Sequence, residues 1–207
     1  MFTTPRLVVI ALCAALNFSI GAIVYLVKLP IYLDSIGTIL CALLLAPDRR
    51  AAFLCAWAAA WMSLVVSSFV NPFLPWFAAT DIAIAGVCAL ATIRAAPVFR
   101  ARPMNTTAFV LCVIGCGILT GVVAAVVSAP VVAYLFGGVT GSGSLFVVAF
   151  FLKTGQQLLS ATLLSGLTAD PVDKVMQVLV AALLYRATPA ALIDLLRVPA
   201  AGEAAAQ

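Results

Sequence analysis

Histidine is absent from the 207 residues of this chain, and charged side chains make up only 9% of them. Soluble globular proteins carry about 25% charged residues, so this chain lacks the polar surface that a soluble fold presents to water. The absence of histidine removes the imidazole on which many zinc and haem sites depend, and the general base of serine hydrolases. The composition therefore excludes a soluble enzyme, and we expect neither a metal site nor a cofactor.

Apolar residues dominate instead, at 65% of the chain, with a mean hydropathy of +1.23. No charged residue lies between Arg50 and Asp81 or between Arg102 and Lys153. The apolar runs are continuous, which favours membrane helices, because the strands of a membrane barrel alternate apolar and polar residues. The sequence predicts an all-α integral membrane protein. Residues 1–199 are expected to form one compact bundle of about six transmembrane helices, followed by a disordered tail at 200–207.

Prolines and charges divide the chain into apolar segments of membrane-spanning or slightly shorter length. The predicted segments are Leu7–Val27, Ile31–Ala46, Ala51–Val70, Phe77–Ala96, Thr107–Phe136 and Leu145–Leu167. A short extra C-terminal helix is predicted at Val175–Tyr185, after a loop around Asp170, Pro171, Asp173 and Lys174. In the alternative, Leu145–Leu167 is re-entrant and Val175–Tyr185 forms the sixth span.

The basic residues predict the orientation, because Lys and Arg accumulate in cytosolic loops. With a cytosolic N-terminus, Lys28 is the basic residue that falls outside. The residues that fall inside are Arg6, Arg49, Arg50, Arg94, Arg100, Arg102 and Lys174. Because these charges are scattered at segment ends, they indicate topology in a lipid bilayer and no nucleic acid partner.

Three charged residues fall within the predicted outer leaflet: Asp34, Asp81 and Lys153. Ionisable groups inside a bilayer are costly, so their convergence predicts a pocket open to the outside. The same side receives further candidate contacts, namely Asn71, Trp76, Tyr134 and Gln156.

Structural alternatives exist for several of these residues. Asp34 precedes a helix and is suited to be its N-cap, and Lys153 with Asp81 could form a structural ion pair. Trp76 and the two tyrosines Tyr32 and Tyr134 could belong to an interfacial aromatic belt. Asn17, in the middle of the first segment, is expected to form an interhelical hydrogen bond.

Motifs for catalysis are lacking. Gly138–Ser144 is glycine-rich but has no P-loop lysine and no preceding strand. Without histidine, serine-histidine and metal-hydrolase mechanisms are excluded, which leaves an aspartyl pair such as Asp34 with Asp81. We therefore expect that the protein is not an enzyme. The six cysteines lie within apolar runs, where cysteine is a small packing residue: Cys13, Cys41, Cys55, Cys88, Cys112 and Cys116.

Several features together suggest a family. Leu29–Thr38 (LPIYLDSIGT) enters a short second helix, and the stretch from Ala129-Pro130 to Gly143 precedes a helix that bears Leu152-Lys153. With the six-helix size, these features resemble a substrate-specificity (S) component of an energy-coupling factor (ECF) vitamin transporter, over about residues 7–187. One departure is Ala46–Arg50, where the family commonly has glycine-proline followed by glycine.

The resemblance implies a mechanism and partners. S components capture a vitamin or related micronutrient in the outer half of the bundle and deliver it inward with a transmembrane coupling protein and two ATPase subunits. Ala11 and Ala15 match the family's Ala-x-x-x-Ala pattern for docking the coupling protein. A prokaryotic inner-membrane location follows, with riboflavin as the first candidate solute. The alternative function is a membrane sensor or scaffold that signals to a partner protein without transport.

Overall fold

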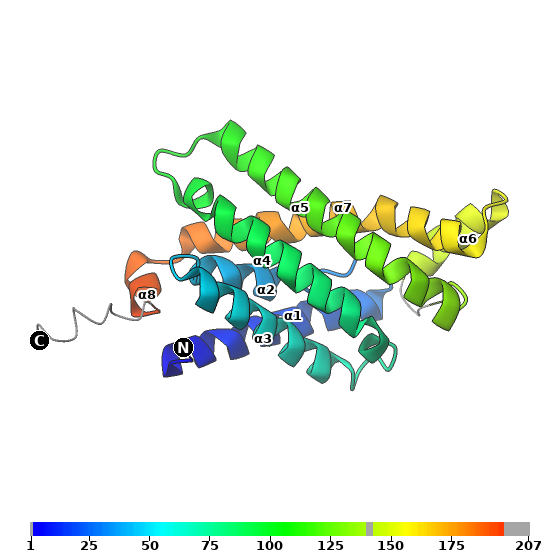
Figure 1. Cartoon of the computed structure of the whole chain (residues 1–207), viewed down its shortest axis with the longest axis horizontal. Helices are drawn as coiled ribbons and strands as arrows, with labels where there is room; N and C mark the ends of the chain where they lie inside the picture. The colour runs from blue at the N-terminus through cyan, green and yellow to red at the C-terminus, as the bar shows by residue number, and fades with distance from the viewer. Residues whose placement is uncertain (1, 140–142, 197–207) are drawn as a thin grey trace, which may run out of the picture.

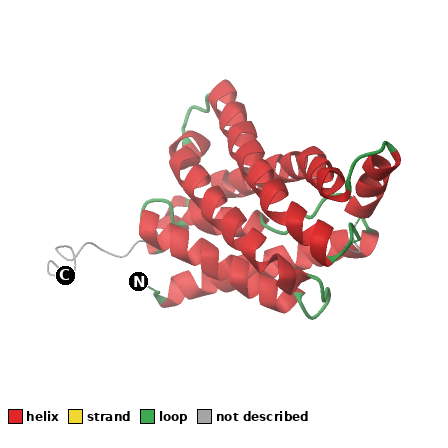
Figure 2. Ribbon diagram, turned by 45° about the vertical axis from the view of Figure 1, so that its right-hand side comes forward, coloured by secondary structure: helices red, strands yellow, loops and turns green. Residues whose placement is uncertain are grey.

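The computed structural model describes residues 2–139 and 143–196, and the regular elements in those ranges are all helical (Figures 1 and 2). The all-α prediction is confirmed for these residues, whereas the predicted tail at 200–207 lies outside them. The elements are α1 (Thr4–Val27), α2 (Ile36–Leu44), α3 (Arg49–Ser67), η1 (Leu74–Phe77), α4 (Ala78–Arg100), α5 (Thr106–Pro130), η2 (Val131–Leu135), α6 (Ser144–Lys153), α7 (Leu158–Ala187) and α8 (Ala190–Leu195).

Four stretches of the described chain are long and apolar enough to cross a membrane: Thr4–Val27, Arg49–Ser67, Leu74–Arg100 and Thr106–Leu135. Each approaches or exceeds the roughly 20 residues that a bilayer requires. Large apolar side chains such as Leu12, Leu111 and Phe146 are exposed on the outer faces of the helices, where they suit contact with lipid. The chain is therefore a multi-pass helical membrane protein. The other described helices are shorter or more polar.

The predictions for the last third of the chain are wrong in detail. The segment predicted as one helix at Leu145–Leu167 is divided, because α6 ends at Lys153 and α7 begins at Leu158. Gly155, with a φ of 88°, follows α6 in the left-handed conformation that commonly ends a helix. The predicted loop at 170–174 and the predicted separate helix at Val175–Tyr185 are both interior parts of the 30-residue helix α7. The short C-terminal helix of the structure is α8.

Helix α7 continues through Pro171 while packed closely on α5. A Cβ atom at Gly117 of α5 would overlap the backbone of Val175, and one at Gly121 would overlap the backbone of Pro171. Small residues four positions apart let membrane helices approach closely where lipid gives no hydrophobic driving force. The two glycines thus form the groove of α5 that receives α7, and Figure 1 shows the two helices crossing.

Helix α2 lies at the centre of the bundle, in contact with α1, α3, α4 and α7. Eight of its nine residues are buried. A helix of this length extends only about 14 Å, less than half of the roughly 30 Å hydrocarbon layer. The predicted second segment, Ile31–Ala46, is thus helical only from Ile36, and residues 28–35 form a linker. The predicted packing role of the cysteines is confirmed for the five that are buried: Cys13, Cys41, Cys55, Cys88 and Cys116.

One end of the bundle, which we call the basic end, carries most of the arginines. It is formed by the start of α1, the α2–α3 and α4–α5 connections, the end of α7, and α8 (left in Figure 1). Arginine side chains join these parts: Arg6 Nε donates to the Leu196 carbonyl at 3.0 Å, and Arg186 donates to the carbonyls of Phe99 and Ala101, each at 3.0 Å. The predicted placement of Lys174 at this end is wrong, because Lys174 is buried in the middle of α7.

Candidate functional site

Helix α7 carries a buried polar face formed by Asp170, Asp173, Lys174 and Gln177. Their spacing of i, i+3, i+4 and i+7 places all four side chains on one side of the helix. Buried polar and charged groups are costly unless they are hydrogen-bonded or paired. The partners of this face therefore show what α7 holds in place.

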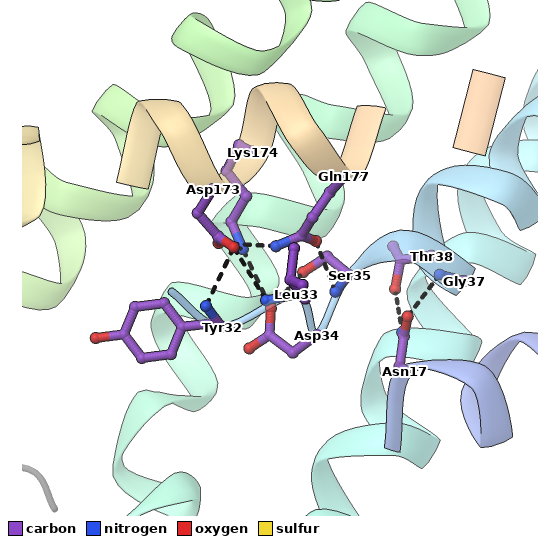
Figure 3. Close-up of polar contacts among 10 residues, drawn as sticks. All are labelled: Asn17, Tyr32, Leu33, Asp34, Ser35, Gly37, Thr38, Asp173, Lys174 and Gln177. Carbon is purple, nitrogen blue, oxygen red and sulfur yellow. Dashed lines mark hydrogen bonds and ion pairs between the residues drawn. The ribbon is translucent and has the colours of Figure 1, made fainter. Parts of the chain in front are cut away.

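The linker between α1 and α2 is the main partner of this face (Figure 3). Asp173 Oδ1 accepts hydrogen bonds from the backbone N–H groups of Tyr32, at 3.1 Å, and Leu33, at 3.0 Å. Gln177 Oε1 accepts from the Ser35 N–H at 2.8 Å, and its Nε2 donates to Asp173 Oδ2 at 2.7 Å. Leu33 has a φ of 51°, which is uncommon for a bulky residue. Two side chains of α7 thus satisfy the linker amides and hold this turn.

Lys174 joins two carboxylates. Its Nζ lies 3.1 Å from Asp34 Oδ1 and 3.0 Å from Asp173 Oδ2. The side chains of Lys174 and Asp173 are 3% and 0% exposed, whereas that of Asp34 is 38% exposed. The structural alternative that Asp34 is the N-cap of the second helix is wrong, because Ser35 occupies that position. Asp34 instead accepts from Lys174 and the Ser35 hydroxyl and keeps part of its carboxylate open.

Asn17 fixes the start of α2 against α1. Its Oδ1 accepts from the Gly37 N–H at 2.6 Å, and its Nδ2 donates to Thr38 Oγ1 at 2.9 Å (Figure 3). The predicted interhelical hydrogen bond of Asn17 is confirmed. The short central helix is therefore held by α1 on one side, and the linker before it by α7.

A cavity, which we call the main cavity, lies beside this linker; its empty space is about 720 Å³, part of which is open to solvent. It is enclosed by the second half of α1, the linker, the second half of α3 and the beginning of α4. Its lining is mostly apolar, with two carboxylates, an amide and aromatic rings: Asp34, Asp81, Asn71, Phe18, Tyr25 and Tyr32.

A second hollow of about 480 Å³ adjoins the main cavity, and both are lined by Tyr32, Asp34 and Asp81. The second hollow reaches α5 and α7 and adds Asp170 and Lys174 to the lining. Asp34 and Asp81 therefore lie where the two spaces meet. The combined space thus touches the five long helices α1, α3, α4, α5 and α7, and Asp34 and Asp81 lie at its centre.

Three of the predicted site residues come together at this place: Asp34, Asn71 and Asp81 line the main cavity. The other predicted contacts lie outside both linings. Trp76 and Tyr134 are 60% and 74% exposed, which fits the alternative of an interfacial aromatic belt. Lys153 and Gln156 are exposed near the break between α6 and α7.

The structural alternative of an ion pair between Lys153 and Asp81 is wrong. Lys153 ends α6 and forms no ion pair in the described part of the chain, whereas Lys174 pairs with Asp34 and Asp173. Lys174, Asp173 and Gln177 were missed because the density of charges around Pro171 suggested a loop. Their helical spacing is the signal in the sequence that could have identified them.

The arrangement is suited to holding a small solute. Carboxylate, hydroxyl and amide groups project from an apolar wall, as in most small-molecule sites. Among the described residues, no group of three His, Cys, Asp or Glu side chains is arranged so that it could hold a metal ion.

Comparisons of the chain with protein-family models, with curated proteins and with solved structures give no match. The class of the protein therefore rests on its own features. It is a helical multi-pass membrane protein with a mostly apolar cavity between its helices, into which a few polar side chains are set.

Proposed function

We propose that this chain is the substrate-binding membrane subunit, or S component, of an ECF-type importer. In this role it captures a vitamin or related micronutrient and works with a transmembrane coupling protein and two ATPase subunits in a prokaryotic inner membrane. The main cavity carries the proposal, because Asp34, Asn71 and Asp81 converge there from three separate parts of the chain. The role is binding and delivery without catalysis.

The position of the cavity supports uptake from outside. Its walls come from Phe18–Tyr25 of α1, Ala60–Ser67 of α3 and Asp81–Ala85 of α4, which belong to the half of the bundle remote from the basic end. Basic residues accumulate on the cytosolic side of membrane proteins, so we place the N-terminus and the basic end in the cytosol. The cavity then belongs to the outer half of the membrane.

The exposed surface of α1 supports docking of the coupling protein. Ala11 and Ala15 are both exposed and lie one helical turn apart, so their small side chains face outward together. Small residues permit close approach of a partner helix in a membrane. We propose this face of α1 as the docking surface.

Two measurements test the function. The protein is purified in mild detergent and denatured, and mass spectrometry identifies any released solute, with riboflavin as the first reference compound. Cells that produce this chain together with an ECF coupling module should accumulate the labelled solute, and cells that lack the chain should not. A sensor or scaffold would instead release no solute and would cause no accumulation, and that result would refute the proposal.

A further inference from the structure

Acidic groups outnumber basic groups around the two hollows. Asp34 and Asp81 line both spaces, and Asp170 lines the second. The one basic residue among the two described linings is Lys174, which lines the second hollow. The ammonium of Lys174 already contacts a further carboxylate, that of the fully buried Asp173. One ammonium is thus shared by several acids, and the two linings hold more acidic than basic side chains.

Asp81 is the acid best placed to meet a solute. In the described part of the chain it forms no hydrogen bond or ion pair, whereas Asp34 has two partners, Lys174 and Ser35. Asp81 lies in the first turn of α4, where the helix dipole favours a negative charge. Its neighbour Thr80 lines the second hollow, and its buried hydroxyl has no hydrogen-bond partner among the described residues. Both groups can accept hydrogen bonds from a bound molecule.

Aromatic side chains complete the lining. Phe18, Tyr25 and Tyr32 border the same cavity as Asp81. The faces of aromatic rings attract cations, and a flat ring in the solute can also pack against them. Lys174 is a poor anchor for an anion, because its side chain is only 3% exposed and contacts two carboxylates.

From this charge distribution we infer that the solute is an aromatic cation, with a protonated amine or amidinium that binds Asp81. The inference rests on the proposed function, since it assumes that the cavity binds a solute. A charge-assisted hydrogen bond is stronger than a neutral one, so a cationic solute gains most from a carboxyl group that has no other partner in the described part of the chain. Riboflavin carries no positive charge and serves as a neutral reference.

The experiment compares three probes with one ring system: tryptamine as the cation, tryptophol as the neutral molecule and indole-3-propionate as the anion. Binding to the full chain in detergent is measured by isothermal titration calorimetry at pH 7. We expect the Kd of tryptamine to be at least about tenfold lower than that of tryptophol, and the anion to bind most weakly. In Asp81→Asn the preference for tryptamine should disappear, whereas Asp194→Asn, outside the cavity, should preserve it.

Two further variants keep the test independent of the folding of Asp81→Asn. Asp81→Glu retains the charge and should retain the preference. Asn71→Lys adds a positive charge to the lining and should abolish it. Melting temperature and gel filtration establish that each variant is folded.

The outcomes separate the inference from the proposed function. Equal or tighter binding of tryptophol or the anion overturns the charge inference and leaves a solute-binding cavity. If no probe binds, the inference is tested by the charge of the solute released from the purified protein. A cationic solute supports the inference, and a neutral or anionic solute overturns it. If no probe binds and no solute is released, the proposed function fails as well.

Discussion

The ammonium nitrogen of Lys174 lies 3.1 Å from Oδ1 of Asp34, although 140 positions separate the two residues in the chain. This contact connects the linker before α2 with the middle of α7. Because Lys174 also binds the fully buried Asp173, the linker and helix share one network of charges and hydrogen bonds. The shape of the main cavity, which Asp34 lines, therefore depends on a helix that contributes none of that cavity's lining residues.

Replacement of Lys174 by methionine should destabilise the protein strongly. The variant leaves Asp173 buried without its cation, and removal of one partner of a buried pair costs about 3–5 kcal/mol. For a chain of this size, the loss corresponds to a fall of roughly 6–20 °C in the melting temperature, measured in detergent. Lys153→Met is the matched control, because Lys153 is exposed, and it should melt within a degree or two of the wild type. Equal melting temperatures for the two variants would contradict the assigned role of Lys174.

Gly37→Ala should separate α1 from α2. A Cβ at Gly37 would overlap the Cys13 carbonyl and press on the Asn17 side chain, so the variant should lose about 1–3 kcal/mol in the free energy of unfolding. Gly86→Ala is the control, since a Cβ there meets nothing within 4 Å. Alanine is the better helix former, so Gly86→Ala should be neutral or stabilising by up to about 1 kcal/mol. Denaturant titration in mixed micelles distinguishes them, and a stable Gly37→Ala variant would disprove this packing.

Acid should weaken the basic end through Asp48. The hydrogen bond from the Ala51 N–H, together with Arg6, holds the pKa of Asp48 below its usual value of 3.8 against the effect of burial. A lowered pKa means that the stabilisation is complete above the unfolded value and is lost as the pH falls through the folded value.

The measurement is the melting temperature between about pH 6 and pH 2.5. The wild type should lose more stability over this range than Asp48→Asn, because asparagine can still cap α3 but does not titrate. The difference should be small, since Asp48 is half exposed. If the melting temperatures of the two proteins fell in parallel with pH, the ionisation of Asp48 would contribute nothing to the pH dependence of stability.

Filling the main cavity should abolish solute binding without unfolding the chain. Ala60 of α3 is half-buried in the cavity lining, so Ala60→Phe places a ring in the space. The purified variant should release at least about tenfold less solute on denaturation. Val65→Phe, on the exposed face of the same helix, should release the wild-type amount. Solute retention in Ala60→Phe would place the binding site elsewhere.

The proposed orientation predicts which ends of the helices face outward. Lys28→Cys, at the end of α1, should react with a membrane-impermeant maleimide in intact cells. Arg102→Cys, at the basic end, should react only after the cells are permeabilised. The wild type provides the background, because five of its six cysteines are buried and Cys112 is partly so. The opposite labelling pattern would reverse the orientation.

Much of the candidate cavity could be predicted from the sequence. Asp34 and Asn71 follow a long apolar run and Asp81 lies near the start of one, and alternating spans bring all three positions to the same half of a membrane bundle. The same logic failed for Lys153, because it assumed one helix from Leu145 to Leu167. Gly155 ends α6 instead, which leaves Lys153 exposed.

The role of α7 could not be predicted from local signals. Two acids, a lysine and a proline within five residues are typical of a loop, and a helix at this position becomes stable only through tertiary contacts. These contacts come from Gly117 and Gly121 of α5, which let the helix approach, and from the linker amides, which satisfy Asp173. Contacts between residues so far apart in the chain cannot be predicted from the local sequence around α7.

The hydrogen bonds from the linker to α7 also constrain the order of biogenesis. The amides of Tyr32, Leu33 and Ser35 are synthesised early, but their acceptors on Asp173 and Gln177 leave the ribosome near the end of translation. Placing a backbone amide without a hydrogen-bond acceptor in hydrocarbon costs several kcal/mol. The linker is therefore more stable near the aqueous interface until α7 is inserted. The insertion of α2 is then a late event, and nascent chains that stop before α7 should leave the linker open to proteases.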